Sequence, residues 1–373
     1  MKRFGLFVDA GNLQSGGAAQ VGSAVLTDFA RLGKEDLSGN QWPLLQRWAY
    51  RASPPVARNI KALVDAGEPL ILGKAGNQFR ESGPFTPSPR AEVRFSIFGP
   101  TRGIRGRNQL VGCADGLTLL RWPEEITKMY PGRNLRIHAK RALWKKEVRR
   151  SQIVVEAPHL KDALIDLGAS EENVHVVPNA LNPAFHEMSE RRLLPYDGER
   201  PFRLFYPARG YLYKNHAMMP SISSICRDAG LDVEFQTTLS PEEFAELGLS
   251  GERSIRNLGV LSISDTAEAY QSADAVFFPS LLETFSATPL EAMAVGCPLI
   301  ASDREFVRNV AQTAAIYFEP TDPESAAEAI MSVASLSRAT HSEVSRGKLI
   351  ADDWPTSQQR SMSYLKILHQ ICT

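Results

Sequence analysis

Short apolar runs alternate with stretches of helical period along the whole chain. The runs in the first half are RFGLFVDA, PLILGKA, EVRFSIFGP, NQLVGCA and QIVVEA, and those in the second half are RLFYPA, VEFQTT, AVFFPS and PLIAS. Continuous apolar runs are typical of strands that are buried on both faces, and their alternation with helices favours parallel pairing. The pattern therefore predicts an α/β protein built on parallel sheets.

A polar stretch near the middle of the chain marks a domain boundary. In HVVPNALNPAFHEMSERRLLPYDGERPFRL a strand ends at Pro-Asn and a segment with Pro and Gly follows, which is typical of a linker. The length of 373 residues also exceeds the size at which one core usually stops growing. We expect one domain at 1–185, a second at 186–354, and a C-terminal helix at 355–373 that crosses back to the first domain.

Composition narrows the class of protein. Hydrophobic residues make up 43% and charged residues 23% of the chain, which is ordinary for a globular protein. No apolar stretch approaches the roughly 18 residues of a membrane span, and the start MKRFGLFVDAGN reads as a strand rather than a signal peptide. The four cysteines lack CxxC spacing and the histidines are scattered, so we expect no metal site and a cytoplasmic protein.

The two halves of the chain carry opposite net charge. Residues 1–180 hold 26 Lys and Arg against 17 Asp and Glu, whereas residues 181–373 hold 16 against 25. The sharpest basic run is RIHAKRALWKKEVRRSQ, and its residues 138–150 could lie on an anionic membrane as an amphipathic helix. A solvated helix of an ordinary domain is the alternative. Aromatic residues are not interleaved as in RNA-binding motifs, so we expect no nucleic acid partner.

One segment, FFPSLLETFSATPLEAMAVGCPLIASD, reads as strand, loop, helix and strand. Glu283 lies in the loop, and Glu291 lies in the first turn of a helix that we expect to open at Pro289. A helix start at the carboxyl edge of a parallel sheet suits an anionic or hydroxyl-rich ligand. Two alternatives need no ligand: a capping box between Thr288 and Glu291, and solvation of Glu283 in its loop.

This segment resembles the Glu-x7-Glu signature of the family 4 retaining glycosyltransferases, which have the GT-B fold. LGVLSISDTAEAYQSADAVFFPS and IYFEPTDPESAAEAI, on either side of it, resemble the same family, as do PARGYLYKNHAMM and SQIVVEAPHLKDALIDLGASEENVHVVPNALNPAF. The resemblance covers roughly the whole chain and is strongest from 150 to 330. It implies two Rossmann-like parallel-sheet domains that face each other across a cleft, with the donor bound to the second domain.

The resemblance also implies roles for individual residues. Arg209 and Lys214 would pair with the donor diphosphate and stabilise charge on the leaving group, which needs no metal or other cofactor; surface solvation is the alternative for both cations. Glu283 would meet the transferred sugar and Glu291 the ribose hydroxyls of the nucleotide. Backbone amides of Phe285, Ser286 and Ala287 would line the sugar and phosphate, and Thr284 would also bind the donor.

At three places this sequence departs from the family's pattern or matches it only loosely. Thr284 and Ser286 replace the two glycines of the family's commoner Glu-Gly-Phe-Gly. Asp115, in CADGLTLLRWPEE, falls roughly where members carry a His, so it could orient the transferring sugar; a simple turn aspartate is the alternative. Gly16 and Gly17 resemble the family's Gly-rich loop near the diphosphate, although Gly-Gly also marks many turns.

The resemblance implies a hexosyltransferase that moves a sugar, with retention, from a UDP- or GDP-sugar to a hydroxyl of a saccharide or lipid-linked acceptor. Its place would be surface polysaccharide or glycoconjugate biosynthesis, in the cytoplasm or at the inner membrane face. One alternative is a nucleotide-sugar epimerase or hydrolase of GT-B fold, which product analysis with and without an acceptor separates. Another is a non-catalytic partner subunit, which would bind nucleotide sugar without turnover.

Overall fold

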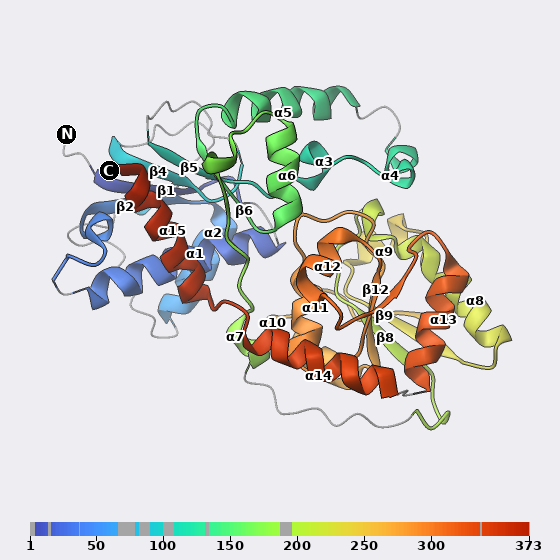
Figure 1. The fold of residues 1–373 in the computed structure, drawn as a ribbon. Coiled ribbons are helices and arrows are strands. Elements are labelled where there is room, and N and C mark those ends of the chain that lie inside the picture. The colour runs from blue at the N-terminus through green and yellow to red at the C-terminus, as the bar shows by residue number, and fades with distance from the viewer. Residues whose placement is uncertain are drawn as a thin grey trace. The chain divides into compact units, whose positions relative to one another are not determined.

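The computed structural model describes residues 4–13, 16–36, 38–65, 79–81, 90–99, 108–130, 134–186, 196–335 and 338–372. The chain forms two compact units (Figure 1). The first comprises Met1–Leu120, Asn134–Ala180 and Pro355–Thr373, and the second comprises Arg121–Arg133 and Leu181–Trp354. The expected boundary after residue 185 thus differs from the observed one after 180, and residues 121–133 group with the second unit rather than the first.

Parallel strands form the sheet of the first unit, in the order β3-β2-β1-β4-β5-β6-β7. Their bounds are β1 (Phe4–Ala10), β2 (Trp48–Ala52), β3 (Phe79–Glu81), β4 (Ala91–Ser96), β5 (Gln109–Gly112), β6 (Gln152–Val155) and β7 (Val174–Val176). The expected strand PLILGKA lies outside the described residues, as does part of the expected linker at 187–195.

Helices of the first unit pack against this sheet to form its cores. They are α1 (Gly16–Glu35), η1 (Pro43–Arg47), α2 (Pro54–Asp65), α3 (Gly116–Leu119), α5 (Asn134–Glu147), α6 (Pro158–Asp166), η2 (Glu171–Asn173) and α15 (Ser357–Cys372). Leu6 and Val8 of β1 share one core with Phe29 of α1 and with Tyr364 and Leu368 of α15. The C-terminal helix therefore belongs to the first unit.

The second unit has a parallel sheet in the order β10-β9-β8-β11-β12-β13. Its strands are β8 (Phe202–Tyr206), β9 (Val233–Thr237), β10 (Ile255–Asn257), β11 (Ala275–Phe278), β12 (Leu299–Ser302) and β13 (Ile316–Phe318). The chain builds outward from β8 in both directions, so the order switches between β8 and β11. Ligands of open α/β sheets bind outside the carboxyl ends of the strands at such a switch point.

Helices flank this second sheet and enclose one large core. They are α4 (Glu124–Met129), α7 (Pro183–His186), η3 (Leu212–Lys214), η4 (His216–Met218), α8 (Met219–Asp228), α9 (Pro241–Glu246), α10 (Ile263–Ser272), α11 (Ala287–Ala294), α12 (Glu305–Ala311), α13 (Pro323–Ala334) and α14 (Arg338–Asp352). The two Rossmann-like parallel-sheet domains predicted by the sequence are confirmed. No helix in the described part of the chain is long and apolar enough to span a bilayer.

Candidate active site

Lys214 and Glu283 meet at the switch point of the second sheet. Lys214 ends η3 in the loop after β8, and Glu283 lies in the loop after β11. Their Nζ and Oε1 atoms form an ion pair, and the side chains are only 14% and 10% exposed. The Lys214 ammonium also lies 6.0 Å from the ring centroids of Tyr213 and Phe278. Two residues 69 positions apart in the sequence thus form one largely buried pair.

Hydrogen bonds to neighbouring strand ends hold the loop that carries Lys214. Asn215 has a φ of 63°, a left-handed conformation that Asn tolerates better than most side chains. Its amide group donates to the carbonyl oxygens of Pro279 (3.3 Å) and Pro320 (2.8 Å). The Tyr206 hydroxyl donates to the Lys214 carbonyl oxygen over 2.9 Å. The backbone of Lys214 is therefore fixed to the carboxyl ends of β8, β11 and β13.

Arg209 lies in the same loop and is held by Glu243. The Nε of Arg209 donates to Oε1 of Glu243 over 2.7 Å, and the backbone amides of Gly210 (3.1 Å) and Ser240 (3.0 Å) donate to the same carboxylate. Burial alone would raise the pKa of Glu243, but these hydrogen bonds outweigh it and lower that pKa. The arrangement leaves the Nη groups of Arg209 without a partner among the residues that the structure describes.

Ser240 and Glu243 have the spacing of a capping box in the sequence, and the structure forms this capping box at the start of α9. The same carboxylate that caps this helix therefore also orients Arg209. Gly210 makes the close approach possible, because a Cβ atom there would lie 2.9 Å from the Cβ of Glu243. The local spacing identifies Glu243 as a capping residue. It does not indicate the contact with Arg209, which lies 34 positions away in the sequence.

The capping box predicted at Thr288 and Glu291 is wrong. Helix α11 begins at Ala287, two residues before Pro289, and its N-cap residue is Ser286, whose side chain makes no capping hydrogen bond. Glu291 is therefore the fifth residue of the helix, too far along it to reach the N-cap amide. Helix capping therefore does not explain the glutamate at position 291.

Glu291 instead contacts the core of the second unit. The hydroxyl of Tyr270, on α10, donates to Oε2 of Glu291 over 2.7 Å. Burial raises the pKa of Glu291 to about 7, against the lowering effect of this hydrogen bond. Tyr270 itself is fully buried, and no sequence motif singled it out. The carboxyl group can therefore exchange a proton near neutral pH, which suits a group that hydrogen-bonds hydroxyls.

Seven residues separate the two glutamates, and the first four of them, Thr284 to Ala287, form the loop and the first residue of α11. Thr284 and Phe285 are half-buried and Ser286 is buried. Among the described residues other than glycine, positive φ angles occur only at Asn215 and Gln312, so the backbone at Thr284 and Ser286 does not require glycine. Side chains at the two positions where the family commonly has glycine are thus compatible with the loop.

The remaining predicted site residues belong to the first unit. Asp115 follows β5 at the N-cap position of α3, where its side chain makes no capping hydrogen bond. Its Oδ2 pairs with Nζ of Lys140 over 2.7 Å. Gly16 and Gly17 are the first two residues of α1 rather than a loop, and a Cβ at Gly17 would meet nothing within 4 Å. These three residues belong to the first unit, whereas Lys214 and Glu283 belong to the second.

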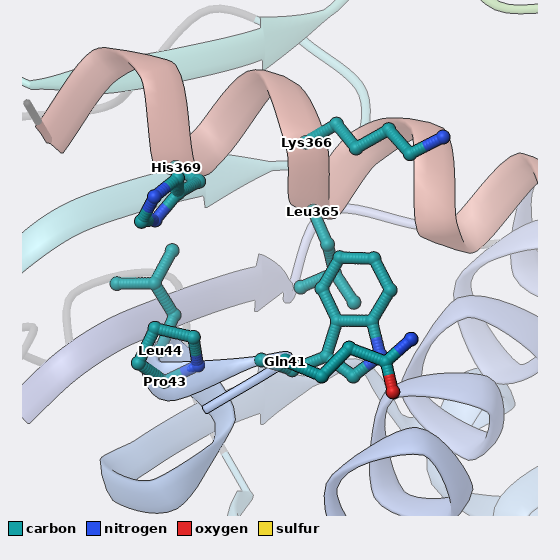
Figure 2. Close-up of a pocket in the computed structure, with 7 residues that line it drawn as sticks. Gln41, Pro43, Leu44, Leu365, Lys366 and His369 are labelled. Atoms are coloured by element: carbon teal, nitrogen blue, oxygen red, sulfur yellow. The ribbon is translucent and has the colours of Figure 1, made fainter. Parts of the chain in front are cut away.

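A pocket of about 180 Å³ lies elsewhere in the first unit, between η1 and α15 (Figure 2). Leu365, Lys366 and His369 of α15 line one side of it, and the segment Gln41–Leu44 lines the other. Because η1 directly precedes β2, the pocket lies at the amino end of the sheet. Parallel sheets bind ligands at the opposite edge, so this pocket is separate from the candidate site.

Histidine and carboxylate side chains do not gather around the Lys214 pair as metal ligands would. In the described ranges, no group of three or more His, Cys, Asp or Glu could hold a metal ion. His216 is buried with its ring centroid 4.9 Å from that of Tyr206. Burial, together with the charge of Lys214, lowers the pKa of His216 to about 3, so its ring is neutral beside the ion pair.

Part of the second unit is similar in sequence to known glycosyltransferases. Residues 246–347 match the family model described as Glycosyl transferases group 1, and this range includes Glu283 and Glu291. MMP alpha-(1->4)-mannosyltransferase of Mycolicibacterium hassiacum is 27% identical over 161 residues, which are 40% of this chain and 36% of that protein. The match thus spans little more than a third of that relative.

Solved structures with the same fold cover nearly the whole chain. A glycosyltransferase from Rickettsia africae is 13% identical with a TM-score of 0.65, over 100% of this chain and 99% of its own. Anabaena HepE in complex with UDP and glucose is 14% identical with a TM-score of 0.64, over 99% and 100%. Sucrose-phosphate synthase from Thermosynechococcus elongatus is 13% identical with a TM-score of 0.65, over 99% of each chain. The chain therefore has the predicted GT-B fold, and its residues 246–347 are similar to the group 1 glycosyl transferases.

Proposed function

We propose that this protein is a retaining glycosyltransferase of family 4 that transfers a sugar from a UDP- or GDP-sugar to a hydroxyl of a saccharide or lipid-linked acceptor. The group 1 domain over residues 246–347 supports transfer chemistry. The names of two similar proteins, a mannosyltransferase and a structure holding UDP and glucose, support a hexose and a nucleotide donor. A role in surface polysaccharide or glycoconjugate synthesis belongs to the same proposal.

The observation that carries the proposal is the buried pair of Lys214 and Glu283 beside Arg209 at the switch point. A donor diphosphate placed at the start of α11 would meet the partly positive end of that helix. Lys214 and the free Nη groups of Arg209 would neutralise the charge that grows on the diphosphate as it leaves. These cations do the electrostatic work that a metal ion does in other transferases, so the proposed reaction is metal-independent.

Glu283 is proposed to hold the transferred sugar through its hydroxyls. Its carboxylate is fixed by Lys214, so it presents a preorganised acceptor rather than a mobile one. In the step itself the bond from the anomeric carbon to the diphosphate oxygen breaks and a bond to the acceptor oxygen forms on the same face. The acceptor's proton passes to the departing diphosphate, which balances the step without a further reactant.

Glu291 and the loop before it are proposed to hold the nucleotide. Its carboxyl group, which accepts a hydrogen bond from Tyr270, would also accept hydrogen bonds from ribose hydroxyls. Backbone amides of Phe285 and Ser286 in the loop and of Ala287 at the start of α11 would line the sugar and phosphate, and Thr284 would also contact the donor. For the first unit we propose only that Asp115, Gly16 and Gly17 lie on the acceptor side.

A thermal-shift screen with UDP-, GDP- and ADP-sugars tests the proposal. A donor at about 100 times its Kd stabilises the folded protein by roughly 2.7 kcal/mol, so one nucleotide class should raise the melting temperature by several degrees. Incubation of that donor with an acceptor panel should then give a glycosylated product with retained configuration. Free sugar or an epimerised donor without acceptor dependence would identify a hydrolase or epimerase instead. Binding without any turnover would identify a non-catalytic partner subunit.

A further inference from the structure

Helix α5 of the first unit presents an outer face whose chemistry the transfer reaction does not use. Leu135 is 83% exposed and Leu143 is 58% exposed on this helix. With exposed Ala139 they occupy positions i, i+4 and i+8, which lie on one face of an α-helix. Large exposed apolar side chains in a row of this kind mark an interaction surface more often than isolated ones do.

The larger apolar residues at the other side of the helix face inward. Trp144 and Val148 are buried in the core that β5, β6 and α6 share. Leu143 is the neighbour of Trp144 in the sequence, but it is exposed while Trp144 and Val148 are buried. The apolar part of the outer face therefore consists of Leu135, Ala139 and Leu143 rather than Trp144.

Two cations of the run also serve the fold rather than the surface. Lys140 pairs with Asp115, and Nη1 of Arg141 donates to the carbonyl oxygens of Thr118 and Leu119, each over 3.1 Å. These bonds satisfy carbonyl groups at the end of α3, which would otherwise lack partners. Neither residue is available to bind a partner without loss of these contacts.

The other cations of the run are exposed along α5 and directly after it. They are Arg136, Lys145, Lys146, Arg149 and Arg150. Between residues 134 and 150 the sequence holds one acid, Glu147, and its carboxylate accepts hydrogen bonds from Gln109 (3.0 Å) and Ser151 (2.6 Å). Among the described residues 135–150, the outer face therefore combines positive charge with apolar side chains and has no exposed acidic side chain.

We propose that the outer face of α5 docks on a bilayer that contains anionic lipids. Leu135 and Leu143 would enter the boundary between headgroups and acyl chains, and the flanking cations would pair with lipid phosphates. A nucleic acid fits this face less well, because the aromatic side chain of the helix, Trp144, is buried and offers no stacking surface. The interaction is peripheral and reversible, since one helix face contributes only two leucines.

Co-sedimentation of the full chain with vesicles tests this docking. Vesicles of phosphatidylcholine with about one third phosphatidylglycerol should bind the protein at low salt, and pure phosphatidylcholine vesicles should not. Raising the salt concentration should weaken binding at least about tenfold, because screening shortens the reach of surface charges. Equal binding to both vesicle types, or no binding to either, would overturn the proposal.

Matched variants assign the binding to this face. Lys145→Gln with Lys146→Gln should reduce vesicle binding about tenfold, and Leu135→Ser with Leu143→Ser should reduce it similarly even at low salt. Leu349→Ser is the control, because Leu349 is 70% exposed on α14, and it should bind like the unaltered chain. Unchanged binding in both double variants would contradict the assignment. So would equal competition by a short single-stranded oligonucleotide, which would indicate a general polyanion site.

Discussion

Tyr270 donates its hydroxyl to the Glu291 carboxylate over 2.7 Å inside the second unit. A carboxyl group that is removed from water is unfavourable when it is ionised, and among the described residues no cation pairs with Glu291. Burial accordingly raises the pKa of Glu291 to about 7. A residue that weakens the fold at neutral pH is a strong candidate for a binding role.

Glu291→Gln should stabilise the protein at alkaline pH. The folded-state pKa of about 7 lies above the ordinary value of 4.5, so the folded state binds more protons than the unfolded state between these values. The contribution of Glu291 to stability therefore falls as pH rises from about 4.5 to 7 and stays low above that. The variant should gain about 1–3 kcal/mol at pH 8 and nothing near pH 4.

Urea unfolding of both proteins between pH 4 and 8 measures this difference. Glu156 also has a pKa of about 7, raised by burial against the effect of Arg360, but it is present in both proteins and cancels. Parallel stability curves would show that Glu291 does not titrate as described. The same variant should bind donor more weakly, because Gln cannot offer the carboxylate to ribose hydroxyls.

Glu243→Ala should weaken binding of a nucleoside diphosphate about tenfold or more. Without Glu243 the guanidinium of Arg209 loses the bond to its Nε and has to be ordered by the ligand at a cost in affinity. Affinity for the nucleoside without phosphates should change little. Isothermal titration of the diphosphate and the nucleoside gives the comparison.

Ser240→Ala is the control for that experiment. It removes the side chain that caps α9 but leaves the contact between Glu243 and Arg209 in place. Loss of the cap should cost about 1 kcal/mol of stability, with the affinity for diphosphate unchanged. Equal affinity losses in both variants would show that the cap, rather than the orientation of Arg209, supports binding.

Asp28→Ala should loosen the C-terminal helix from the first unit. The buried carboxylate of Asp28 accepts hydrogen bonds from the hydroxyls of Ser357 (2.6 Å) and Ser361 (2.7 Å) of α15. Its removal leaves these two hydroxyls without their partner and should cost about 2–4 kcal/mol. Limited proteolysis should then cut the chain near Pro355. Ser363→Ala, which removes an exposed bond within α15, should leave the cleavage rate unchanged.

The sequence predicted what depends on local pattern. Runs such as AVFF, now β11 with all four side chains buried, and the Ser240 capping box are visible in a few consecutive residues. Thr288 and Glu291 have the same local spacing, yet α11 starts earlier and Tyr270, 21 positions away, contacts the carboxylate. A tertiary contact of this kind overrides a local motif and leaves no trace in the sequence around it.

The basic run shows the same limit. Composition identifies its cations, but only packing decides that Lys140 and Arg141 bind within the first unit while Lys145 and Lys146 face outward. The pairing of Lys214 with Glu283 likewise depends on the strand order that makes β8 and β11 neighbours. The sequence predicts that Lys214 and Glu283 each follow a strand. It does not predict that β8 and β11 are neighbours in the sheet.

Because Lys214 and Glu283 form a largely buried ion pair, replacing either residue should affect both stability and activity. Removing one partner leaves a buried charge unpaired and should cost about 3–5 kcal/mol, so a loss of activity in Lys214→Met or Glu283→Gln alone has two explanations. The double variant removes both charges and should recover most of the stability. Its remaining defect then reports on chemistry rather than folding.

Sugar transfer by the Lys214→Met, Glu283→Gln double variant, measured at a temperature where its melting curve shows it folded, tests the central claim most directly. With the donor selected by the thermal-shift screen, the account predicts transfer at least about 100-fold slower than in the unaltered protein. Transfer at the unaltered rate in this folded variant would contradict the placement of the active site at Lys214 and Glu283.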